Sequence, residues 1–136
     1  MDAKTNRARR RARAVEVVEE TTRVLRTDPG DRAALRRRLN AYVSLGWADA
    51  AERDATALLA ANPDQAKLLA VRAKLRIALG RPADAERDAA ALLVLDPHRA
   101  LALYTALALA LRAPGSTFTP IVRYVVGKVS PGEVFW

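Results

Sequence analysis

The amino-acid sequence predicts an all-α fold, an α-solenoid of about six to seven helices arranged as antiparallel hairpins. Two repeated features predict this architecture. Proline follows Asp or Asn at positions 29, 63 and 97, and a Leu-Gly pair ends at positions 46 and 80, so both features recur after 34 residues. When residues 45–66 are aligned with residues 79–100, twelve of the 22 pairs are identical. A fixed interval of this length is typical of a repeat that contains one pair of helices.

Local signals place the helices in order along the chain. An Asp-Pro or Asn-Pro pair suits a helix start, because the Asp or Asn side chain can cap the first turn and proline is tolerated there. Glycine suits a helix end, where the backbone often takes a left-handed conformation. Leucine and alanine recur at helical spacing between these signals. The expected helices are residues 7–26, 30–45, 48–61, 64–79, 82–95 and 98–112.

The second helix of each expected hairpin combines small and charged residues. Alanines fall on one stripe, which allows two helix backbones to approach closely; they are Ala51, Ala55, Ala85 and Ala89. The tripeptide Glu-Arg-Asp occurs at 52–54 and again at 86–88. Residues two apart on a helix do not face one another, so these carboxylates do not form a catalytic pair. We interpret the tripeptides as a charged, solvent-exposed face.

Over residues 12–112 the pattern resembles the tetratricopeptide repeat family. The large first-helix position of that family corresponds to Leu35, Leu69 and Leu103, and its second-helix alanine corresponds to Ala51 and Ala85. The aromatic position of the first helix is Tyr42 in one repeat, but Arg76 and Ala110 in the others. The resemblance implies helix pairs stacked into a right-handed superhelix, with the first helices lining a concave groove that receives a peptide.

The resemblance also implies which residues line the groove. The corresponding positions are Arg36, Asn40, Val43, Lys67, Lys74, Ile77 and Leu101. Arg36 and Asn40 lie where one subclass, which binds chaperone C-termini, carries a Lys and an Asn that hold a terminal carboxylate. Val71 and Leu101 differ from that subclass, so we expect a groove that is basic at one end and apolar at the other. The implied role is a non-catalytic scaffold for a protein or peptide partner that is acidic or has an apolar segment.

An arginine-rich arm supports a first alternative function. Residues 1–13 contain five clustered arginines and contribute to a net charge of +8; the arginines are Arg7, Arg9, Arg10, Arg11 and Arg13. Such a cluster can neutralise phosphates and give salt-sensitive binding to nucleic acid. Aromatic residues make up only 5% of the chain, so a base-stacking platform is not expected.

The end of the chain supports a second alternative. A repeat domain at 14–112 is followed by an expected capping segment and apolar tail at 113–136, which ends in Phe135 and Trp136. Residues 117–129 fit either a helix or a strand, because they are rich in β-branched side chains. In this hypothesis the repeats carry the tail, which docks on another protein or is modified by an enzyme. The apolar helix at 98–112 also favours a homodimer.

No pattern for catalysis, a cofactor or a metal is found. The chain has no cysteine, which excludes disulfides and thiolate metal sites, and its single histidine, His98, has no nucleophile and acid arranged around it. No apolar run reaches the roughly 18 residues that a membrane helix requires. The arginines are not followed by an apolar segment, as in a secretory signal, so we expect a cytoplasmic protein that is not an enzyme.

Overall fold

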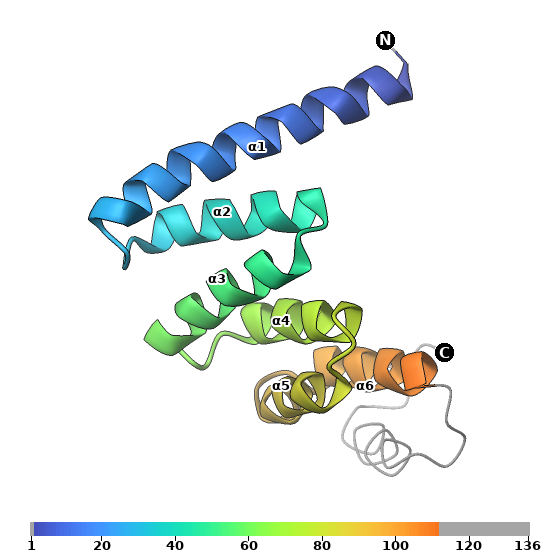
Figure 1. Ribbon diagram of the computed structural model, residues 1–136. Helices are drawn as coiled ribbons and strands as arrows, with labels where there is room; N and C mark the ends of the chain where they lie inside the picture. Colours follow the sequence, from blue (N-terminus) through green and yellow to red (C-terminus); the bar gives the residue numbers. More distant parts are fainter. Residues whose placement is uncertain (1, 112–136) are drawn as a thin grey trace. The chain divides into compact units, whose positions relative to one another are not determined.

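The computed structural model describes residues 2–111, which form six α-helices and no strand in that range (Figure 1). The helices are α1 Ala3–Thr27, α2 Arg32–Leu45, α3 Ala48–Ala61, α4 Ala66–Ala78, α5 Pro82–Leu95 and α6 Pro97–Leu111. The predicted all-α class is confirmed. The observed ends of α2 to α6 lie within two residues of the expected ones, whereas α1 begins four residues before its expected start.

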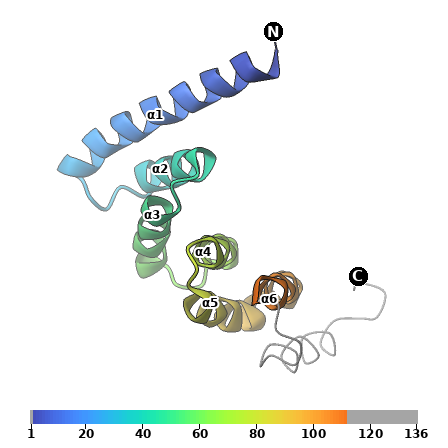
Figure 2. The same cartoon turned by 45° about the vertical axis from the view of Figure 1, so that its right-hand side comes forward.

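The chain divides into two compact units between Pro63 and Asp64. In the first unit α2 packs against both α1 and α3. In the second unit α5 packs against both α4 and α6, and α4 also contacts α6. Figure 2 shows α5 beside α4 and α6. Consecutive helices within each unit run antiparallel, so the predicted hairpins are present in both.

The long helix α1 begins with a cap that the sequence analysis missed. The carboxylate of Asp2 accepts a hydrogen bond from the backbone N–H of Thr5 at 2.8 Å. Hydrogen bonds from Thr5 also lower the pKa of Asp2, because they favour the charged carboxylate. Arg and Ala, which dominate the arm, are good helix formers. The arm therefore continues α1 and is not a separate extended segment.

The Asp-Pro and Asn-Pro pairs do not all start helices as predicted. Pro29 and Pro63 lie in the loops, and the residues before them end α1 and α3. The N-cap of α2 is Asp31, whose carboxylate accepts a hydrogen bond from the N–H of Ala34 at 3.0 Å. Of these three prolines, only Pro97 is the first residue of a helix. The interpretation was wrong for Pro29 because Asp31, after the proline, supplies the cap; after Pro63 the helix begins at Ala66, and its N-cap Gln65 makes no capping hydrogen bond through its side chain.

The two glycines predicted at helix ends do take the left-handed conformation. Gly46 has φ of 74° and Gly80 has φ of 73°. The following N–H groups donate back to the last turn, from Trp47 to the carbonyl of Tyr42 at 2.9 Å and from Arg81 to that of Arg76 at 2.8 Å. These bonds satisfy carbonyl groups that the helix leaves open, and they turn the chain into α3 and α5.

The alanine stripe lies at the centre of each hairpin. Ala51, Ala55, Ala85 and Ala89 are all fully buried. Because a methyl group is so short, the backbones of the two helices of each hairpin can approach one another closely. Larger side chains fill the remaining core, and the most deeply buried are Leu58, Leu92, Leu103, Tyr104 and Leu107.

The prediction that both Glu-Arg-Asp tripeptides lie on a solvent-exposed face was wrong for their aspartates. Asp54 and Asp88 are 3% and 2% exposed. Arg38 holds Asp54 through two hydrogen bonds, of 2.8 and 2.7 Å, and Arg72 holds Asp88 in the same way, at 3.0 and 2.6 Å. The hydrogen bond to Asp54 raises the pKa of Arg38. Each ion pair ties the first helix of a hairpin to the second.

Candidate functional site

Three of the predicted groove residues share one exposed face of α2. Arg36, Asn40 and Val43 follow one another at intervals of four and three residues, so they lie along one side of the helix. All three are exposed, and Val43 is 48% exposed although it is apolar. Side chains on this stripe are therefore accessible to a partner, and none of them belongs to the core of the first unit.

The other predicted groove residues belong to the second unit. Lys67 and Lys74 are exposed on α4, while Ile77, on the same helix, is half-buried. Leu101 is half-buried on α6, which contacts α4. The structure thus places these four residues on two neighbouring helices of one unit. Arg36, Asn40 and Val43 form a separate stripe in the first unit.

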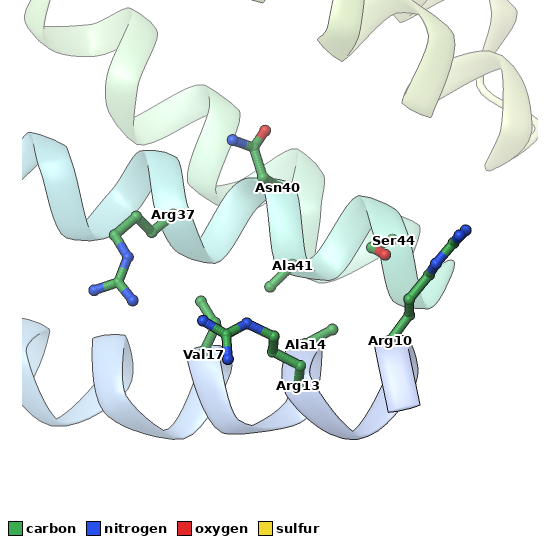
Figure 3. Close-up of a pocket in the computed structure, with 8 residues that line it drawn as sticks. All are labelled: Arg10, Arg13, Ala14, Val17, Arg37, Asn40, Ala41 and Ser44. Atoms are coloured by element: carbon green, nitrogen blue, oxygen red, sulfur yellow. The ribbon is translucent and has the colours of Figure 1, made fainter. Parts of the chain in front are cut away.

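A hollow of about 400 Å³ lies between α1 and α2 in the first unit. It joins two sets of residues that the sequence analysis treated separately, the arginine-rich arm and the stripe on α2. Its lining consists of Arg10, Arg13, Ala14, Val17, Arg37, Asn40, Ala41 and Ser44. In Figure 3 the small side chains of Ala14 and Ala41 lie between the two helices, with Arg13 at the same gap.

The rim of this hollow is basic and its floor is apolar. Arg10 and Arg13 are exposed, and neither makes an ion pair with any residue from 2 to 111. Arg37 contacts Glu20 at 3.5 Å, but both side chains are more than half exposed, so water screens the pair strongly. The hollow can therefore bind a negatively charged group above a small apolar surface.

The sequence analysis missed Arg37 and Ser44 as lining residues. The signal that could have found them is helical spacing, because Arg10, Arg13 and Val17 share a face of α1 and Arg37, Ala41 and Ser44 share one of α2. The remaining arm residues, Arg7, Arg9 and Arg11, are also exposed. Arg7, Arg10 and Arg13 follow one another at intervals of three residues and lie along one side of α1, whereas Arg11 points away from them.

The remaining expectations from the sequence concern the tail, metal binding and membrane crossing. Phe135 and Trp136 lie outside residues 2–111, as does the capping segment, so the tail hypothesis stays a prediction. Among residues 2–111 no group of three or more His, Asp or Glu side chains could hold a metal ion. None of the helices in this range has both the length and the apolar character needed to cross a membrane.

No family model matches the sequence, and no curated protein matches it in sequence. Solved structures do match the fold. A tetratricopeptide repeat protein from Parabacteroides merdae ATCC 43184 superposes with a TM-score of 0.70 at 24% identity, over 88% of this chain and 47% of that one. This chain has the fold of a tetratricopeptide repeat protein. It spans about half the length of the Parabacteroides merdae protein.

A second tetratricopeptide repeat structure carries a ligand. The first such domain of Spaghetti (RPAP3), bound to the HSP90 peptide SRMEEVD, matches with a TM-score of 0.64 at 25% identity. The match covers 81% of this chain and 89% of that one. The tetratricopeptide repeat fold that the sequence predicted is therefore confirmed by two structures, one of which holds a peptide.

Proposed function

We propose that this tetratricopeptide repeat chain is a non-catalytic scaffold that binds a peptide or a helix of another protein through its first helices. The contact residues in this proposal are Arg36, Asn40, Val43, Lys67, Lys74, Ile77 and Leu101. The observation that carries it is the exposed stripe on α2, where Val43 is 48% exposed between polar neighbours. The peptide-bound neighbour supports the same kind of ligand.

The charge of the exposed first-helix residues indicates the chemistry of the partner. Arg36, Lys67 and Lys74 are all basic and exposed, and the chain carries a net charge of +8. Electrostatic complementarity favours an acidic partner and speeds its association. Val43, Ile77 and Leu101 favour apolar side chains in the same ligand. We therefore propose an acidic segment with interspersed apolar residues.

A peptide selected from a display library on the full chain would test this proposal. Arg36→Glu and Lys74→Glu should each weaken its binding by about ten-fold, or ~1.4 kcal/mol, since both reverse a charge that faces the ligand. Fluorescence anisotropy of the labelled peptide measures the Kd. The control is Arg87→Glu, which reverses an arginine on α5 whose side chain is 82% exposed. Equal affinity for all four proteins would reject the groove assignment.

The unpaired arginines of α1 favour nucleic-acid binding as a second candidate. None of Arg7, Arg9, Arg10, Arg11 and Arg13 makes an ion pair with another residue in the range 2–111. In this hypothesis affinity for generic DNA or RNA falls steeply with salt, because counterions are released from the phosphates. Deletion of residues 1–13 should remove the affinity for nucleic acid. If that affinity survives the deletion, the arm is not the binding site.

A further inference from the structure

The second helices of the two complete hairpins bury one face against their own first helices. Three positions, each repeated after 34 residues, define this face. Ala51 and Ala85 are fully buried, Asp54 and Asp88 are 3% and 2% exposed, and Leu58 and Leu92 are 1% and 0% exposed. Arg38 of α2 and Arg72 of α4 reach across to the two aspartates. A first helix therefore covers this face in both α3 and α5.

Residues 14–27 of α1 follow the pattern of a second helix, but the corresponding face is open. One interval before α3, the same three positions are Val17, Glu20 and Val24. Val17 is half-buried, the Glu20 side chain is 54% exposed and Val24 is 42% exposed. Residues 3–13 extend α1 itself and supply no first helix for it. Within residues 2–111 α2 touches one edge of this face, where Val17 packs beside Ala41 and Leu45 and Arg37 lies 3.5 Å from Glu20, but no helix occupies the place of a first helix.

The charges along this face determine how a helix would fit. Glu20 occupies the position at which Asp54 and Asp88 each accept from an arginine of the first helix. Arg10 and Arg13 lie towards the start of α1, where a helix antiparallel to α1 would end. The C-terminal carbonyls of a helix carry the negative end of its dipole and attract cations. The face is therefore complementary to an antiparallel helix with a central arginine.

We propose that the face formed by Arg10, Arg13, Val17, Glu20 and Val24 docks one amphipathic helix of a partner protein. The helix lies antiparallel to α1, with an arginine directed at Glu20, apolar side chains on Val17 and Val24, and its C-terminal carbonyls directed at Arg10 and Arg13. The hollow between α1 and α2 is one edge of this site. The inference rests on the proposed function, because both require a polypeptide partner, but it names a different surface.

A second copy of this chain is the less suitable occupant. Its arginine-bearing first helices, α2 and α4, are already paired with α3 and α5 through the buried ion pairs. Releasing either one would leave an aspartate buried without its partner, which is costly. Two copies would also bring together two chains that each carry a charge of +8. A separate partner helix avoids both costs.

The probe for this site is a stapled, fluorescent 17-residue peptide with the sequence of residues 64–80, which carries both arginines that pair with Asp88, Arg72 and Arg76. It should bind the full chain, and Glu20→Arg should weaken binding by at least about ten-fold. A probe in which Arg72 is replaced by Glu should bind the unsubstituted chain as weakly as the original probe binds the Glu20→Arg variant. Pairing that probe with Glu20→Arg should restore affinity to within about three-fold, because the charges are then exchanged.

Two further variants keep the test independent of folding and of the groove. Val24→Asp should abolish probe binding, whereas Arg11→Glu, an exposed change on the side of α1 that faces away from Glu20, should leave the Kd unchanged; circular dichroism checks that both are folded. Lys74→Glu, the substitution that tests the groove residues, should also leave the Kd of the probe unchanged. Equal probe affinity of the original chain and Glu20→Arg overturns the proposal. The proposal is also overturned if light scattering shows a homodimer that the Glu20→Arg substitution dissociates. A second copy of the chain would then cover the face.

Discussion

At the scale of single residues, Asp54 and Asp88 show how the hairpins depend on a buried charge. Both aspartates accept two hydrogen bonds from one arginine, and Asp88 accepts a further one from Arg76 at 3.0 Å. A buried pair gains little over an apolar pair of the same size, but removing one partner leaves the other charge uncompensated. These contacts therefore make each hairpin sensitive to loss of either partner.

We expect Asp54→Asn to lower the free energy of unfolding by about 3 kcal/mol, the lower end of the range for a broken buried ion pair. Asp88→Asn should cost more, because it leaves two guanidinium groups, of Arg72 and Arg76, next to a neutral amide. Urea denaturation measures both losses. Glu16→Gln, which removes an exposed carboxylate on α1, should change stability by less than about 0.5 kcal/mol. A larger loss for Asp54→Asn than for Asp88→Asn would contradict this account.

The aspartates also show why this part of the structure could not be predicted from the sequence. Spacing within a helix correctly indicated that Glu52 and Asp54 do not face one another. It carried no information about Arg38, which lies 16 residues before Asp54 and reaches it only after the hairpin has formed. The recurrence of Arg38 as Arg72, together with Asp54 as Asp88, at the 34-residue interval was the available signal.

At the scale of elements, the glycines that end α2 and α4 allow a clean test of backbone conformation. A Cβ atom at Gly46 or Gly80 would meet nothing within 4 Å, so substitution there is free of steric clash. Both residues nevertheless have positive φ, which strains a residue with a side chain. Gly46→Ala and Gly80→Ala should each destabilise the chain by about 1 kcal/mol.

Gly30 is the matched control for those two substitutions. It lies in the loop before α2 and has no positive φ, and an added Cβ would be 3.8 Å from the Asp28 carboxylate, an ordinary contact. Gly30→Ala should therefore leave stability unchanged or raise it slightly, since alanine restricts the unfolded chain. Thermal and urea denaturation of the three variants measure the difference. A similar loss in all three would mean that the left-handed conformation is not the cause.

The end of a helix could be predicted from the sequence where only one nearby residue suits that end. The two glycines placed the ends of α2 and α4 to within about one residue, because left-handed backbone has few alternatives to glycine. The start of α2 was misplaced because Asp28 and Asp31 both suit a cap, and Asp31 forms the bond to Ala34. The hollow was missed because the faces of the first two expected helices were not compared, although Arg10, Arg13 and Val17 share one face of α1.

At the scale of the whole molecule, the chain is a repeat protein whose contacts are short in sequence. The inter-helix ion pairs named above join neighbouring helices, from Glu20–Arg37 in the first unit to Arg72–Asp88 in the second. In such proteins stability is approximately a sum of terms for single repeats and for their interfaces. A local loss of stability then need not spread over the full chain.

Hydrogen exchange of backbone amides can show whether the two units open separately. Asp88→Asn should increase exchange in α4, α5 and α6 by more than about a hundred-fold, because that unit loses more than ~3 kcal/mol, and leave α1 and α2 within about two-fold. Asp54→Asn should produce the reverse distribution. Mass spectrometry of peptic fragments resolves the six helices of residues 2–111. If either substitution raised exchange equally in all of them, the chain would unfold as one cooperative block, and its stability could not be divided between the two units.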